Sequence, residues 1–270
     1  MIVCFRNFAD MKSAFMKVLM LAMLIIGLCG PMALADTVTI SGRVTDYNGE
    51  PIDSCTVMVV NPDFNEAYTA VSDADGKYRL DNVSKGRYAA IAAMRENEYP
   101  RALAVDKKDM RLEFWAWNVV ADHDINLDIR YEKMELYGTT AFREYGGRPE
   151  LLIYTRPMSV TKVIEYGDFM DKSVMEKEAK VTIEPQYMTF EVYADGQPLK
   201  ILSVQHLSLV NDNGNVNNDD CYMLQTSLPS QIYNPDRRAI EIRVVGHNSQ
   251  YDESGESVYY WQPPVYDWKQ

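Results

Sequence analysis

The histidines of this sequence do not have the spacing that enzyme active sites require. None of the three, His123, His206 and His247, lies in an H-x-x-E or H-E-x-x-H motif, which would bring zinc ligands together. The sequence also lacks a G-x-S-x-G nucleophile motif and a glycine-rich phosphate loop before a helix. Cys221 is a lone cysteine, and such residues are more often structural than nucleophilic. We therefore predict no catalytic residues, no cofactor and no enzyme activity, with an active site of unrecognised type as the minor alternative.

The stretch Asn211–Asp220 is rich in the oxygen ligands that Ca²⁺ prefers. It departs from the EF-hand order, because Val216 stands at position six, where glycine is required, and no Glu follows at position twelve. Asn and Asp also stabilise turns by bonding to the nearby backbone. We predict a polar loop here and no metal site. Asp73 and Asp75 have the same explanation, since a hairpin turn accounts for both.

Two pairs of aromatic residues are the candidate ligand-binding residues: Trp115 with Trp117, and Tyr259 with Trp261. Residues two apart on a strand point to the same face, so each pair could stack on a sugar ring. Large aromatic side chains more often fill a core or a seam between domains. The seam is the favoured interpretation, because the tryptophan pair lies just before the expected domain boundary.

The elements that would hold these residues are strands. Residues 37–45 alternate apolar and polar side chains, which predicts a strand with one buried face. Asn48–Gly49 and Asp73–Gly76 are turn signals, in which the glycines supply positive φ angles and the Asp side chains accept backbone hydrogen bonds. Further strands are expected near 55–61, 66–72, 77–81, 86–94, 101–105, 111–120 and 125–129.

These motifs resemble the carboxypeptidase regulatory-like domain, a small transthyretin-like (prealbumin-like) β-sandwich. The resemblance rests on Gly42–Asp46, Gly49–Ile52, Asp73–Tyr78 and Gly86–Tyr88, and it covers 37 to about 105 well. It implies a non-catalytic module of the kind found in secreted and outer-membrane proteins, especially of Bacteroidetes-type bacteria. The motif is specific for fold and says little about function.

The first 35 residues have the features of a secretory signal. A positive segment with Arg6, Lys12 and Lys17 precedes the apolar run Val18–Leu28, and Ala33–Leu34–Ala35 is a cleavage motif before Asp36. The run is shorter than the roughly 20 residues of a membrane-spanning helix. We expect an exported protein without a transmembrane segment in its mature form, periplasmic, outer-membrane-associated or extracellular. A lipid anchor at Cys29 is the less favoured alternative, because Leu28 stands where lipoprotein signals usually have a small residue.

The charge of the chain argues against a nucleic-acid partner. Removing residues 1–35 takes away three basic side chains and one acidic side chain, so the net charge changes from −12 to −14. Phosphate binding requires a basic surface instead. Only Cys55 and Cys221 remain after processing, so no disulfide framework is expected.

Residues 133–270 also have the pattern of a β domain, although they resemble no family that we recognise. Strands are expected near 134–142, 150–155, 221–225 and 239–245, with a strong hairpin over 187–210 and a candidate short helix at 171–180. We predict an all-β protein: a signal peptide (1–35), a transthyretin-like sandwich (36–132) and a second β-sandwich-like domain (133–270).

A regulatory-like domain without an attached enzyme suggests a binding or scaffolding protein of the bacterial cell envelope that engages a protein partner. The alternative is a carbohydrate-binding protein of a glycan-utilisation system, for which the aromatic pairs would contact a surface glycan. Exposed tryptophan rings in a groove would favour the glycan, and buried rings would favour assembly.

Overall fold

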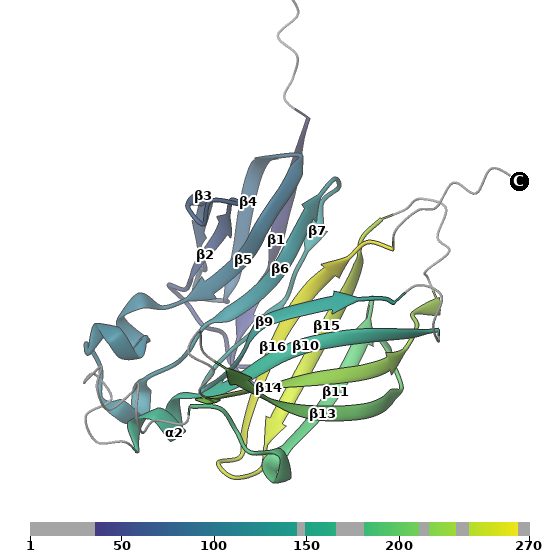
Figure 1. Ribbon diagram of the computed structural model, residues 1–270. Helices are drawn as coiled ribbons and strands as arrows, with labels where there is room; N and C mark the ends of the chain where they lie inside the picture. Colours follow the sequence, from purple (N-terminus) through teal and green to yellow (C-terminus); the bar gives the residue numbers. More distant parts are fainter. Residues whose placement is uncertain (1–35, 145–148, 166–180, 211–215, 231–237, 264–270) are drawn as a thin grey trace, which may run out of the picture. The chain divides into compact units, whose positions relative to one another are not determined.

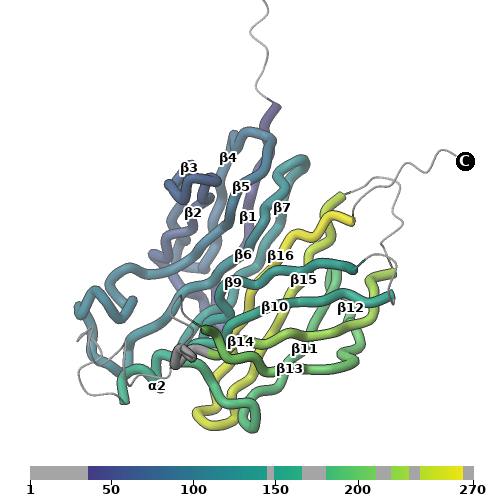
Figure 2. The backbone as a smooth tube through the Cα atoms, in the orientation of Figure 1, coloured from purple at the N-terminus to yellow at the C-terminus, as the bar shows by residue number. Residues whose placement is uncertain are grey.

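The computed structural model describes residues 36–144, 149–165, 181–210, 216–230 and 238–263 (Figures 1 and 2). Almost all regular structure in these residues is β-strand, which confirms the all-β class. The expected signal peptide with Cys29 and the candidate helix at 171–180 lie outside them.

The strands before residue 132 are β1 (Thr37–Thr45), β2 (Thr56–Val60), β3 (Glu66–Val71), β4 (Lys77–Ser84), β5 (Gly86–Met94), β6 (Phe114–Ala121), β7 (Ile125–Asn126) and β8 (Ile129–Arg130). Those after it are β9 (Met134–Phe142), β10 (Glu150–Ser159), β11 (Met188–Ala194), β12 (Gln197–Pro198), β13 (Ile201–Val210), β14 (Val216–Ser227), β15 (Ile240–Asn248) and β16 (Glu253–Trp261). A short helix, α2 (Val160–Ile164), follows β10, and 3₁₀ turns occupy Glu96–Glu98, Pro100–Ala102, Lys107–Asp109 and Pro185–Tyr187.

The first sandwich is built around β1, the strand on which the predicted motifs begin. It lies between β4 and β7 in one sheet, and it also pairs with β8. Side chains of this sheet, such as Ile40, meet Val57 of β2 and Ile91 of β5 in the first hydrophobic core. Asp73 closes the β3–β4 turn by accepting bonds from the backbone N–H groups of Asp75 (2.9 Å) and Lys77 (2.8 Å), as predicted.

The second sandwich places the sheet β13–β14–β10–β9 against β15 and β16. Leu136 of β9, Ile153 of β10 and Val244 of β15 belong to its core. In Figure 1 this sheet lies over the strands that end the chain.

One long sheet belongs to both sandwiches. Its order is β12–β11–β15–β16–β6–β5–β2–β3, and the join is a parallel pairing of β16 with β6. Along β16, Val258 and Tyr260 belong to the first core and Trp261 to the second. Since alternate residues of a strand point to opposite faces, the two cores lie on opposite faces of this sheet. Residues 37–270 form one compact unit; the division into 36–132 and 133–270 stays a prediction.

Three local predictions are wrong. Residues 101–105 are not a strand: Pro100–Ala102 forms a 3₁₀ turn, and Leu103 has a φ of 51°, in the left-handed region. The predicted hairpin over 187–210 is also much shorter, because its return strand is the two-residue β12, while β13 crosses to the other sheet and pairs with β14. Finally, the predicted polar loop 211–220 ends early, because β14 begins at Val216.

None of the helices in the described part of the chain has the length and apolar composition needed to span a bilayer.

Candidate ligand-binding site

Trp115 and Trp117 project from β6 on the face of the long sheet that is opposite the first core. Their neighbours along the strand, Phe114 and Ala116, point into that core. On β5 the residues paired with the two tryptophans are Ala92 and Ala90. These small side chains leave room for the indole rings, which are partly exposed.

The two indole rings stack on each other, with centroids 4.7 Å apart and an interplanar angle of 12°. Tyr137 of β9 meets both rings edge-on, at 5.7 and 5.3 Å. Phe64, in the β2–β3 turn, lies 6.3 Å from each ring and is 55% exposed. We call these four residues the aromatic cluster. Because each indole covers one face of the other, only the outer ring faces remain available to a ligand.

Trp115 lines a cavity of about 690 Å³, which we call the Trp115 cavity. Its lining includes the side chains of Tyr99, Arg101, Glu113, Trp115, Glu135, Tyr137 and Arg156. A second cavity, of about 430 Å³, is lined by Tyr88, Trp117, Asn118, Tyr137, Thr139 and Tyr259, among others. Trp115 lines only the first cavity and Trp117 only the second, so the indole stack stands between them.

Two glutamates give the Trp115 cavity its polar character. Glu135 is only 3% exposed, and its Oε2 has no hydrogen-bond partner among the described residues. Burial raises the pKa of Glu135 well above its ordinary value, and the nearby Glu113 carboxylate adds to this. Burial also raises the pKa of Glu113, while a bond of 2.9 Å from Trp115 Nε1 opposes the shift.

Two arginines balance these carboxyls. Arg156 holds its guanidinium 5.3 Å from the centre of the Tyr137 ring, in a cation–π contact. Its charge acts against the rise in the pKa of Glu135, and Arg101 acts in the same way on Glu113. Flat apolar ring faces beside hydrogen-bonding carboxyls and guanidiniums can hold a ring that carries hydroxyl groups.

Three of the four residues predicted from the sequence lie near one another. Trp117 and Tyr259 are opposite each other in the β6–β16 pairing and line the same cavity, with Trp115 next to them. Trp261 is 4% exposed and packs in the second core.

Sequence reasoning missed Phe64, Glu113, Glu135, Tyr137 and Arg156. Part of the signal was present, because Glu113 lies two residues before Trp115 and Glu135 two before Tyr137, the spacing of a shared strand face. The neighbourhood of β6 and β9 could not be read in the same way, since it depends on which strands become adjacent.

The histidines lie on separate elements, as their spacing suggests. His206 on β13 is 3.1 Å from Asp220, and His247 on β15 is 3.8 Å from Asp252. Within the described residues, no group of three or more His, Cys, Asp or Glu side chains could hold a metal ion.

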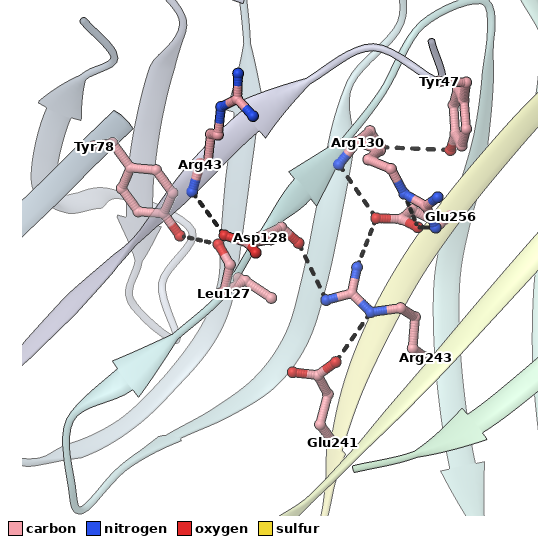
Figure 3. A network of polar contacts seen from close by, with 9 residues as sticks. All are labelled: Arg43, Tyr47, Tyr78, Leu127, Asp128, Arg130, Glu241, Arg243 and Glu256. Atoms are coloured by element: carbon pink, nitrogen blue, oxygen red, sulfur yellow. Dashed lines mark hydrogen bonds and ion pairs between the residues drawn. The ribbon is translucent and has the colours of Figure 1, made fainter. Parts of the chain in front are cut away.

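A second polar cluster, which we call the arginine network, lies on the other face of the long sheet (Figure 3). The Glu256 side chain is completely buried, and it accepts bonds of 2.6 Å from both Arg130 and Arg243. Arg243 also donates to Glu241 (3.0 Å) and to the backbone carbonyl of Asp128 (3.1 Å). Because these charges neutralise one another, the network is better explained as a structural link than as a site for an anion.

Comparison with known proteins agrees with the resemblance drawn from the turn motifs. Residues 39–108 match the family model of the carboxypeptidase regulatory-like domain. No curated protein matches the chain.

Three solved structures are similar to the chain at low identity. The first, a candidate carbohydrate-binding protein from Bacteroides uniformis, is 13% identical, with a TM-score of 0.27 over 78% of this chain and 89% of that one. A DUF3823 family protein from Parabacteroides merdae is 10% identical, with a TM-score of 0.25 over 84% of this chain and 100% of that one. The major pilin subunit BcpA of Bacillus cereus is 11% identical, with a TM-score of 0.25 over 82% of this chain and 68% of that one.

Proposed function

We propose that this protein is a non-catalytic carbohydrate-binding protein of the bacterial cell envelope, and that its binding site is the aromatic cluster with the Trp115 cavity. The observation that supports this most directly is the partly exposed indole stack beside a cavity with polar walls. A ring that only filled a core would have no reason to border open space of this size. Sugar rings present apolar C–H faces to aromatic rings and hydroxyls to the groups around them.

The site is assembled from both halves of the chain, which suits a rigid platform. Trp115 and Trp117 come from β6, whereas Tyr137 comes from β9 and Tyr259 from β16. All three elements are strands held in ladders, so the ring positions are fixed before a ligand arrives. Such preorganisation lowers the entropy that binding costs.

Trp115→Ala tests this proposal, with Phe142→Ala as the matched control, because Phe142 is an exposed aromatic residue on β9 that lines neither cavity. Wild type should retain at least one glycan on an array. Trp115→Ala should lose about 2 kcal/mol of binding free energy, about thirtyfold in Kd. Because the ring is partly exposed, thermal unfolding should show a loss of only about 1–3 kcal/mol.

Trp115→Phe, which keeps an apolar ring, should recover part of the affinity. Glycan binding equal to wild type in Trp115→Ala would contradict the proposal, and so would an array on which wild type retains no glycan.

A protein partner is the second candidate function, and strand β13 favours it. This strand forms one edge of its sheet, and within the described residues no strand pairs with its outer side. Its exposed apolar side chains are Leu202, Val204, Leu207 and Val210. Residues 201–210 contain no Lys, Arg, Asp, Glu or Pro, the residue types that usually protect an open edge.

An uncharged edge can pair with a second copy of itself without charge repulsion, so we expect assembly through antiparallel β13 strands. Sedimentation velocity over a range of concentrations should show a dimer for wild type. Val204→Lys should be monomeric with an unchanged unfolding midpoint. A wild-type protein that remains monomeric up to about 100 μM would rule out this assembly, because a dimer with a Kd above that concentration would be weak.

A further inference from the structure

Glu135 is an unusual feature of the Trp115 cavity. Buried polar atoms in proteins nearly always have a hydrogen-bond partner. The Glu135 side chain is almost completely buried, it borders the cavity, and its Oε2 has no partner among the described residues. The polar atom that would complete this pairing can therefore come from a ligand in the cavity.

The charges of the lining argue against a charged ligand. Glu113 and Glu135 face Arg101 and Arg156 within the same cavity. An anionic group would meet the two carboxyls, and a cationic group would meet the two guanidiniums. A neutral ligand avoids both repulsions, and its hydroxyls can accept from arginine and donate to a carboxyl.

The aromatic side chains define where the apolar part of the ligand lies. The inner face of the Trp115 indole is covered by Trp117. Tyr137 presents its edge to the stack, and Tyr99 forms another part of the cavity wall. A ring entering the cavity can thus stack on the outer face of Trp115.

We propose that the ligand of the Trp115 cavity is a neutral sugar ring, with one hydroxyl bonded to Glu135 Oε2 and an apolar face on Trp115. This inference rests on the carbohydrate binding proposed above and specifies its ligand class.

The test uses an array carrying neutral, uronic-acid and amino-sugar oligosaccharides, followed by titration of the strongest neutral binder. Glu135→Leu removes both oxygens at similar volume and should weaken binding tenfold or more. Glu135→Gln keeps an acceptor oxygen, so its Kd should be within about threefold of the wild-type value, a much smaller change than for Glu135→Leu. Both variants should unfold at or above the wild-type midpoint, so that lost binding is not lost folding.

The outcomes separate the two proposals. If wild type binds only uronic-acid or only amino-sugar oligosaccharides, the neutral ligand class is wrong while carbohydrate binding holds. If Trp115→Ala loses binding but Glu135→Leu does not, the role of Glu135 is wrong. If wild type binds none of the three classes, carbohydrate binding and this inference are both wrong.

Discussion

Glu135 and Glu256 show how much a buried carboxylate depends on the residues around it. Glu256 accepts bonds from two arginines, whose positive charges compensate its carboxylate for the hydration that is lost on burial. Glu135 has the carboxyl of Glu113 as a neighbour, and its Oε2 has no partner among the described residues. The paired Glu256 carboxylate can stabilise the fold, whereas the Oε2 atom of Glu135 can still form a hydrogen bond with a ligand.

Glu135 should make the stability of the protein depend on pH. Below the ordinary glutamate pKa of about 4.3, the folded and unfolded chains both hold the proton and there is no penalty. As the pH rises through the raised pKa of the folded state, the unfolded chain loses its proton first and the folded state loses stability. The charge of Glu113 raises the folded-state pKa of Glu135 and the charge of Arg156 lowers it, so the two together affect how far this pH range extends.

Urea unfolding of wild type and Glu135→Gln between pH 5 and pH 8 measures this effect. Wild type should lose about 1–3 kcal/mol more than the variant over this range. Asp81→Asn, at an exposed carboxylate, serves as the control and should follow wild type. Parallel curves for wild type and Glu135→Gln would show that Glu135 does not titrate differently in the two states.

Cys55 should be unreactive in the folded protein. It is completely buried, and this burial raises the pKa of its thiol to about 11. At pH 8 only about one molecule in a thousand then carries the reactive thiolate. Both Cys55 and Cys221 are free thiols in the structure.

Alkylation followed by peptide mapping should therefore leave Cys55 unmodified in native protein at pH 8 and modify it fully in guanidinium chloride. Rapid labelling of Cys55 in the native protein would mean that the segment before β2 opens. A peptide joining Cys55 to Cys221 without reduction would contradict the free thiols.

At the scale of elements, the turn before β4 depends on Gly76 more than other turns depend on their glycines. Gly76 has a φ of 76°, and a Cβ there would lie 2.3 Å from the Val44 carbonyl oxygen. Gly49 has a similar φ of 86°, but a Cβ there would meet nothing within 4 Å. The two positions therefore separate backbone strain from steric overlap.

Gly49→Ala should cost about 1 kcal/mol, the usual penalty for a left-handed alanine. Gly76→Ala should cost about 2–4 kcal/mol, because the turn or β1 must also move. Equal urea midpoints for the two variants would mean that the overlap at Gly76 is relieved without cost.

A bulge in β9 also shapes the candidate site. Tyr154 is opposite Thr140 while Arg156 is opposite Tyr137, so β9 contains one more residue than β10 in this interval. Gly138 lies in the bulge with a φ of 65°. Because a bulge redirects the side chains beside it, it helps to explain why Tyr137 meets the indole stack edge-on.

Local signals in the sequence predicted the elements whose causes are local. The Asp73–Gly76 turn follows from turn chemistry, and the strand containing Trp115 follows from its aromatic and β-branched residues, whereas the first sandwich was expected from the family resemblance. The path of β13 does not, because Leu199–Val210 has the same alternation whether it pairs with β11 or with β14. The Trp115 cavity was missed for a related reason, since Glu113 and Glu135 meet only through the packing of β6 beside β9.

At the scale of the whole molecule, the pairing of β6 with β16 joins the two strands most distant in sequence among the strand pairs of the described residues. It brings Ser257 opposite Trp115 and continues one sheet through both sandwiches. On the first-core face of that sheet the arginine network connects β8 of the first sandwich to the last two strands, since Arg130 belongs to β8 while Arg243 and Glu256 belong to β15 and β16 (Figure 3). The network therefore links segments that are more than a hundred residues apart.

Glu256→Gln should destabilise the protein strongly, because the change leaves Arg130 and Arg243 without their shared counter-charge. Removing one partner of a fully buried ion pair costs about 3–5 kcal/mol, and we expect the lower end, about 3 kcal/mol, since Arg130 is partly exposed and keeps some hydration. Asp81→Asn breaks the exposed pair with Arg79 and should change stability by less than about 1 kcal/mol.

Urea unfolding followed by circular dichroism and by tryptophan fluorescence measures both variants. Trp115 and Trp117 lie on β6 and Trp261 on β16, so their fluorescence reports on the two joined strands, whereas circular dichroism reports on all the strands. For Glu256→Gln we expect a single transition at a lower urea concentration with both probes, because the shared sheet couples the two sandwiches. If Glu256→Gln unfolds at the same urea concentration as Asp81→Asn, the arginine network does not stabilise the contact of β8 with β15 and β16.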